Sequence, residues 1–150
     1  MPTLLIAENR KNQRALCRME LEEAGYGVIE AEDGWEALRV VREMRIDLVV
    51  LDPFGQGFDR IQVLRGIKEM EAGPPVVIYT GYVLHPDDPH RHLADAWVTK
   101  RSDVAPLKQA IAGVLHRKIR QTSGVHEAEG RHADIPHPSW RVIQWHSVTI

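Results

Sequence analysis

The sequence predicts an α/β domain with a doubly wound, five-stranded parallel sheet that carries helices on both faces. Three observations support this prediction: short apolar runs rich in β-branched residues, amphipathic stretches between them, and a regular alternation of the two as far as residue 118. Nearly continuous apolar runs are typical of strands that are buried on both faces. Strands that alternate with helices form βαβ units, which place a parallel sheet between two helical layers.

The five apolar runs are the predicted strands. They share β-branched composition and polar or turn-forming flanks, and in chain order they are Leu4–Ala7, Val28–Ile29, Leu48–Leu51, Val76–Tyr79 and Ala96–Val98. Each is too short for a typical globular helix, so a strand is the better interpretation.

Four of the intervening stretches have apolar residues at helical spacing. In chain order these residues are Leu16, Cys17, Leu21 and Ala24; Ala37, Leu38, Val41 and Met44; Ile61, Leu64 and Ile67; and Leu107, Ile111, Val114 and Leu115. Gly25 is the expected C-cap of the first helix. A further helix, the fourth of five in chain order, is expected between Gly81 and Leu93. It is predicted to be short or irregular, because Pro89 would break a helix interior.

The periodic pattern ends at Lys118, so residues 1–118 are predicted as the folded domain. Residues 119–135 are polar and contain glycine, which indicates a linker. Residues 136–150 are predicted as a C-terminal tail with the aromatic and β-branched content of a docking strand. Trp140 and Trp145 are expected to pack on this domain, on another protein, or on a second copy of the chain in a homodimer.

Composition narrows the class of protein. A formal net charge of −2 gives no overall field toward nucleic acid or an anionic membrane, so neither is an expected partner. No apolar run is long enough to span a bilayer, and the N-terminus lacks a signal-peptide pattern. Cys17, the single cysteine, excludes an intramolecular disulfide and is expected to be a buried structural thiol. We therefore expect a cytoplasmic protein.

Polar residues collect where the predicted strands end. Glu8 and Asn9 follow the first strand, Asp52 the third, Thr80 the fourth, and Lys100 the fifth. Ligands of open parallel sheets bind beyond the carboxyl ends of the strands. Carboxylates, a hydroxyl and an ammonium at that edge suit phosphoryl transfer, in which a carboxylate is the nucleophile and cations neutralise the phosphoryl oxygens.

These residues also carry a family resemblance. The segments LLIAEN, EEAGYGVIEAEDGWEAL, IDLVVLDPFGQGFD, PPVVIYTGY and DAWVTK occur in the order found in response-regulator receiver domains of two-component signalling. The chain resembles this CheY-like family from residue 3 to about residue 118. The resemblance implies a flavodoxin-like sheet with strand order 2-1-3-4-5.

The resemblance also implies roles for individual residues. Asp52 would be the phosphoacceptor, phosphorylated by a histidine kinase, a phosphotransfer protein or a small phosphodonor. Mg²⁺ would be bound weakly by four residues, namely Glu8, Asn9, Asp52 and, through its backbone carbonyl, Phe54. The phosphate-binding and switch residues would be Thr80, Lys100 and Trp97. For two residues a simpler role stays open: Asn9 as the N-cap of the first helix, and Trp97 as a packing residue.

Several residues depart from the family pattern. Asn9 replaces the usual second acid, which should lower the affinity for Mg²⁺ because this ion prefers anionic oxygen ligands. Arg101 replaces a proline that follows the lysine in a cis peptide, so the Lys100–Arg101 bond is expected to be trans or strained. Pro53 lacks an N–H group, and Gly55–Gly57 replace an apolar-proline turn, which should loosen the loop after Asp52.

Two functional hypotheses follow. The first is a stand-alone response regulator, not an enzyme, that is phosphorylated on Asp52 and signals through protein–protein contacts. The second is a pseudo-receiver, a binding module that neither binds Mg²⁺ nor accepts a phosphoryl group. A hydrolase with an aspartyl nucleophile is disfavoured, because no inserted cap segment or second catalytic acid near Asp52 would form its substrate pocket.

Overall fold

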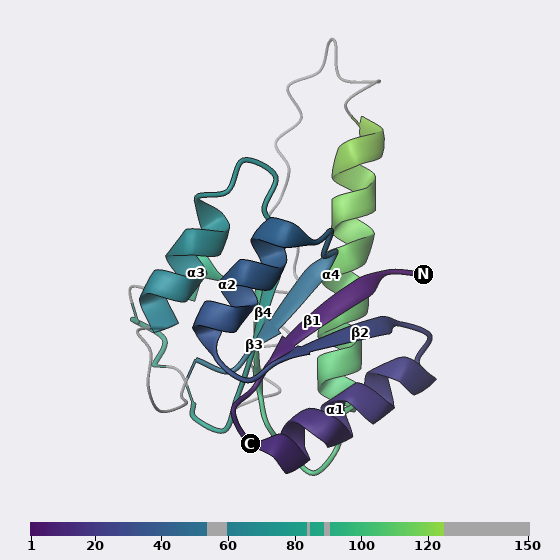
Figure 1. The fold of residues 1–150 in the computed structure, drawn as a ribbon, viewed down its shortest axis with the longest axis vertical. Helices are drawn as coiled ribbons and strands as arrows, with labels where there is room; N and C mark the ends of the chain where they lie inside the picture. Colours follow the sequence, from purple (N-terminus) through teal and green to yellow (C-terminus); the bar gives the residue numbers. More distant parts are fainter. Residues whose placement is uncertain (54–59, 84, 89–90, 125–150) are drawn as a thin grey trace.

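A computed structural model describes residues 1–53, 60–83, 85–88 and 91–124. Its centre is a five-stranded sheet in the order β2-β1-β3-β4-β5, with every neighbouring pair parallel (Figure 1). The strands are β1 (Thr3–Ala7), β2 (Gly27–Ala31), β3 (Leu48–Leu51), β4 (Val76–Thr80) and β5 (Ala96–Thr99). The predicted fold class and strand order are confirmed.

Four α-helices lie in the described part of the chain: α1 (Lys11–Glu23), α2 (Gly34–Glu43), α3 (Arg60–Lys68) and α4 (Ala105–Gly124). Between β4 and β5, the described residues contain only a 3₁₀ turn, η1 (Arg91–Leu93), where an irregular helix is predicted. Prolines in this stretch of sequence explain its irregularity, because each removes a backbone donor that a helix needs. Pro89 itself lies outside the described residues.

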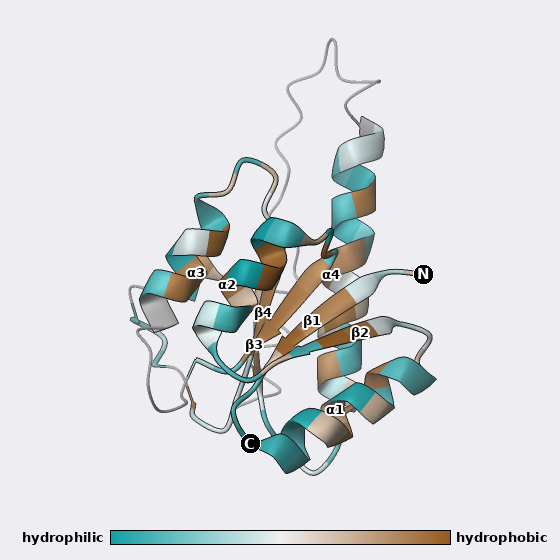
Figure 2. Cartoon of the chain, viewed as in Figure 1, coloured by the Kyte–Doolittle hydropathy of each residue, from teal (hydrophilic) through white to brown (hydrophobic). Residues whose placement is uncertain are grey.

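The helices form two layers, one on each face of the sheet (Figure 1). Apolar residues of α1 and α4 pack with Leu4 and Ile6 of β1, whereas those of α2 and α3 pack with Leu5 and Ala7. Adjacent residues of a strand point to opposite faces, so each buried strand serves both cores. Figure 2 shows the result: apolar strands between helices whose outer surfaces are hydrophilic.

Not every residue of the predicted apolar stripes is buried: Leu16, Ala24 and Met44 are exposed, and Leu115 is partly buried. Leu16 and Met44 are each 49% exposed. The buried residues of α1 are Arg14, Cys17 and Leu21, so Leu16 lies about 100° around the helix from Cys17. Met44 is the C-cap of α2 with extended backbone angles, so the chain has already left the helix there. The side chain of Ile61 lies outside the described residues.

Helix α4 extends beyond the domain boundary predicted at Lys118. It reaches Gly124, six residues into the segment predicted as a linker. Residues 119–123 contain neither glycine nor proline, and the Thr122 hydroxyl donates to the carbonyls of Lys118 (3.1 Å) and Ile119 (2.9 Å). The predicted tail, with Trp140 and Trp145, lies outside the described residues. None of the described helices is long and apolar enough to cross a membrane.

Candidate functional site

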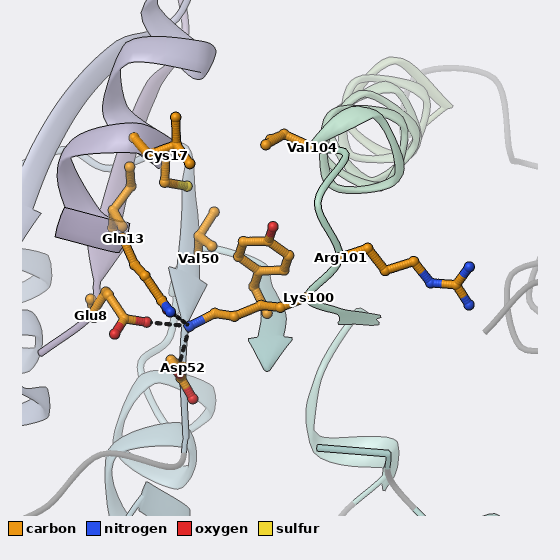
Figure 3. Close-up of a pocket in the computed structure, with 12 residues that line it drawn as sticks. Glu8, Gln13, Cys17, Val50, Asp52, Lys100, Arg101 and Val104 are labelled. Carbon is orange, nitrogen blue, oxygen red and sulfur yellow. Dashed lines mark hydrogen bonds and ion pairs between the residues drawn. The ribbon is translucent and has the colours of Figure 1, made fainter. Parts of the chain in front are cut away.

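Three of the predicted site residues meet at the carboxyl edge of the sheet. The Lys100 ammonium donates hydrogen bonds to Glu8 Oε2 (2.5 Å) and to Asp52 Oδ2 (2.7 Å). Figure 3 shows the lysine side chain reaching across the site toward both carboxylates. The sequence separations are 92 and 48 residues, so it is the sheet that brings these groups together.

Backbone hydrogen bonds continue the sheet ladder into this site. The Glu8 N–H donates to the Ala31 carbonyl (3.2 Å), and the Asp52 N–H donates to the Ala7 carbonyl (3.0 Å). On the other side, the Lys100 N–H donates to the Thr80 carbonyl (2.6 Å). Each residue that follows a strand is therefore still held by the neighbouring strand, which fixes where its side chain begins.

The fourth member of the cluster is Gln13, in the first turn of α1. Its Oε1 accepts a hydrogen bond from the Lys100 ammonium at 2.7 Å, beside Glu8 and Asp52 (Figure 3). Sequence reasoning did not identify this residue. The available signal was its position five residues after Glu8, in the first turn of the helix that follows β1.

The charged groups of the cluster are largely shielded from water. The side chains of Glu8, Asp52 and Lys100 are 6%, 12% and 17% exposed. Burial of a charge is costly unless pairing and hydrogen bonds compensate it. Glu8 has such compensation on its second oxygen as well, because Oε1 accepts the Arg10 N–H at 3.0 Å. The cluster is thus a preorganised group of two carboxylates and one ammonium.

Arg14 of α1, the helix that also carries Gln13, supports Glu8. Its Nη1 donates to the Glu8 backbone carbonyl at 2.8 Å, and Arg14 itself is buried. The guanidinium also lies 3.8 Å from Glu30 and 3.7 Å from Glu32, at the end of β2. This contact ties the first turns of α1 to the edges of β1 and β2.

Asn9 is not part of the described cluster. It is exposed, and it is not the N-cap of α1 either: that position belongs to Arg10, which makes no side-chain capping bond. The capping interpretation of Asn9 is therefore wrong. The helix begins at Lys11, two residues after Asn9, and the Arg10 N–H donates to Glu8 Oε1.

Thr80 and Trp97 are both buried. The Thr80 hydroxyl oxygen accepts the Tyr82 N–H at 3.2 Å, which holds the turn after β4. The Trp97 ring packs in the core on the α2–α3 side, and its indole N–H donates to the Arg91 carbonyl at 3.0 Å. The packing interpretation of Trp97 is confirmed, and a switch role for it stays a prediction.

The loop after β5 departs from the family pattern as the sequence suggests. The described part of the chain contains no cis peptide bond, so Lys100–Arg101 is trans. The Arg101 side chain points away from the cluster (Figure 3). Phe54 and Gly55–Gly57 lie outside the described residues, so the predicted carbonyl ligand stays a prediction.

A cavity of about 150 Å³ adjoins the cluster between α1 and the loop after β5. Its wall includes Tyr79 beside the polar residues. Cys17 and Val50 also line it (Figure 3). Burial raises the pKa of the Cys17 thiol to about 12 and that of the Tyr79 phenol to about 12. Both groups stay protonated at neutral pH, so neither provides an anionic nucleophile, and Cys17 is the expected structural thiol.

The donor set fits a divalent cation only in part. Among the described residues, no group of three Asp, Glu, His or Cys side chains is arranged to hold a metal. Mg²⁺ commonly takes one or two carboxylates and keeps several waters, so Glu8 and Asp52 would suffice as protein ligands. Both now contact the Lys100 ammonium, which would have to move aside to admit a second cation.

Solved structures of receiver proteins share this fold. The response regulator TrrA from Thermotoga maritima, solved in complex with Mg²⁺-BeF, is 29% identical with a TM-score of 0.72, covering 76% of this chain and 99% of that one. TrrA in complex with the histidine kinase ThkA is 30% identical with a TM-score of 0.71, covering 77% and 99%. Two-component proteins are therefore similar to this chain in both sequence and fold.

Sequence comparison points to the same family. The family model described as the response regulator receiver domain matches residues 4–112. The transcriptional regulatory protein GlrR of Escherichia coli (strain K12) is 31% identical over 121 residues, which are 79% of this chain but 27% of that protein. The sporulation initiation phosphotransferase F of Bacillus subtilis (strain 168) is 33% identical over 79 residues, 53% of this chain and 64% of that protein. The chain belongs to the response regulator receiver domain family.

Proposed function

We propose that this receiver domain accepts a phosphoryl group on Asp52 from a histidine kinase, a phosphotransfer protein or a small phosphodonor. The observation that carries the proposal is the position of the Asp52 carboxylate at the carboxyl end of β3, 2.7 Å from the Lys100 ammonium. The complex of TrrA with the kinase ThkA supports a kinase as the donor. In the cytoplasm, the signal would then pass to another protein through protein–protein contacts.

The proposed reaction uses groups that are already in place. An Asp52 carboxylate oxygen attacks the phosphorus atom, and the bond from phosphorus to the donor breaks. The donor's leaving group keeps the electron pair of that bond. The Lys100 ammonium would then face the phosphoryl oxygens, and the Thr80 hydroxyl, whose oxygen accepts the Tyr82 N–H, would donate a hydrogen bond to a phosphoryl oxygen.

A divalent cation would supply charge neutralisation at the phosphoryl oxygens. Glu8 and Asp52 would hold it, with Asn9 and the Phe54 carbonyl completing the predicted set. We expect weak binding, because Asn9 brings no charge and the Lys100 ammonium already offsets one of the two carboxylates. The Mg²⁺ in the TrrA structure supports this assignment.

A pseudo-receiver is the second candidate function. Two observations favour it: Asn9 is exposed outside the cluster, and Lys100 lies between the two carboxylates that a cation would need. Under this hypothesis the internal ammonium replaces the metal permanently, and the domain serves as a binding module. The two hypotheses predict different responses of the chain to Mg²⁺ and a phosphoryl mimic.

Addition of beryllofluoride and Mg²⁺ is expected to change the tryptophan fluorescence of the chain. Trp97 is buried and pairs with Ile78, which lies two residues before Thr80 on the same face of β4. Movement of the Thr80 hydroxyl should therefore alter the surroundings of the indole. Fluorescence titration measures this change, and Trp97→Phe is the control that removes it. No response at saturating Mg²⁺ would favour the pseudo-receiver.

A further inference from the structure

We propose that Gln13 is a positioning residue that holds the Lys100 ammonium between Glu8 and Asp52 and thereby lowers the affinity of the site for a divalent cation. The inference rests on the proposed function, in which these two carboxylates bind the cation. Gln13 would set how readily the Lys100 ammonium is displaced by a divalent cation.

The geometry around Lys100 supports this role. An ammonium has three N–H donors, and this one meets three acceptors: Glu8 Oε2 at 2.5 Å, Gln13 Oε1 at 2.7 Å and Asp52 Oδ2 at 2.7 Å. Two acceptors carry charge, and only the Gln13 amide is neutral. Gln13 thus completes the shell of the ammonium without adding a charge that would attract a metal ion.

The surroundings of the Lys100 ammonium make the third acceptor, Gln13 Oε1, important. The Lys100 side chain is 17% exposed, so water has limited access to its ammonium. The ring of Tyr79 lies on another side, with its centroid 5.6 Å from Nζ. A buried donor left without an acceptor is unfavourable, and a hydrogen bond to a charged group is stronger than one between neutral groups. Loss of the Gln13 carbonyl should therefore weaken the hold on the ammonium.

The consequence concerns competition between two cations. Glu8 and Asp52 cannot contact the ammonium closely and bind Mg²⁺ with full strength at the same time, because like charges repel at short range. An ammonium that leaves more easily makes room for the metal. Gln13 acts on the metal only through Lys100, so its effect must vanish when the ammonium is removed.

The test is a double-mutant cycle read by Mg²⁺ binding alone, with isothermal titration calorimetry on the whole chain. Gln13→Met keeps the length and helix preference of the side chain but removes the acceptor. We expect it to lower the Kd for Mg²⁺ roughly three- to tenfold, the range that corresponds to one ordinary intramolecular hydrogen bond. Lys100→Met should lower the Kd by at least about tenfold, since it removes a competing charge.

In the Lys100→Met background, Gln13→Met should change the Kd by less than about twofold, because the two residues are coupled. Asn12→Ala, at an exposed position next to Gln13, is the matched control and should leave the Kd unchanged. A thermal melt checks folding, and Gln13→Ala replaces Gln13→Met if the latter is unfolded. An unchanged Kd in both Gln13 variants, or no Mg²⁺ binding in any variant, would overturn the inference. Phosphorylation of wild-type Asp52, followed separately by intact mass, would show that the proposed function survives such a result.

Discussion

Asp52→Ala is expected to abolish phosphorylation of this chain completely. In the presence of Mg²⁺ and acetyl phosphate, the wild-type chain should gain the mass of one phosphoryl group, and the variant should gain none. The reason is that the alanine side chain has no oxygen nucleophile, and the neighbouring Glu8 carboxylate is held by the Arg10 N–H and by Lys100. Intact-mass spectrometry measures the difference directly.

Asp87→Ala is the matched control, because Asp87 is an exposed carboxylate between β4 and β5 whose Oδ2 lies 3.7 Å from His85 Nδ1. It should be phosphorylated like the wild-type chain. Equal labelling of Asp52→Ala and wild type would mean that the phosphoacceptor is another residue, which peptide mapping would then identify.

Asn9→Asp should raise the affinity for Mg²⁺ by about tenfold. The substitution places a third carboxylate beside Glu8, and an added unit charge near a partly exposed site contributes on the order of 1–4 kcal/mol to the attraction for a cation. Because Asn9 is exposed, the lower half of that range is appropriate. Calorimetric titration with Mg²⁺ at fixed ionic strength measures the Kd.

Asn12→Asp provides the control for net charge. Asn12 is also exposed and lies three residues after Asn9. Asn12→Asp therefore adds the same charge as Asn9→Asp, but at a position that does not directly follow β1. Its effect on the Kd should be small. If Asn9→Asp behaves no differently from Asn12→Asp, the missing acid is not what limits metal binding, and the segment after Asp52 becomes the candidate cause.

The fold could be predicted from the sequence because the strands are nearly continuous apolar runs, as buried strands are. Leu48–Leu51 is buried along its whole length, as a central parallel strand must be. The helix ends were harder to predict. The segment after Lys118 is polar, which suits both a linker and the solvent face of a long helix, and only the structure distinguishes these for residues 119–124. Met44 shows the same limit, since one residue beyond a helix end the periodic pattern no longer applies.

The candidate site was predictable to the extent that it follows from strand ends. Glu8, Asp52 and Lys100 meet because parallel strands finish at one edge of the sheet. Gln13 was not predictable in this way. Its contact depends on the angle at which α1 leaves β1 and on a lysine side chain that extends from the end of β5 past β4 to reach the other strands. Neither feature has a sequence pattern of its own.

A crystal structure of the chain with Mg²⁺ and beryllofluoride would test the central claim most directly. We predict beryllofluoride bonded to the Asp52 carboxylate, a cation held by Glu8 and Asp52, and the Lys100 ammonium moved from Glu8 and Gln13 to the fluoride. Asp52 without an adduct, with Lys100 still bound to Glu8, Gln13 and Asp52 at saturating Mg²⁺, would contradict phosphorylation at this site.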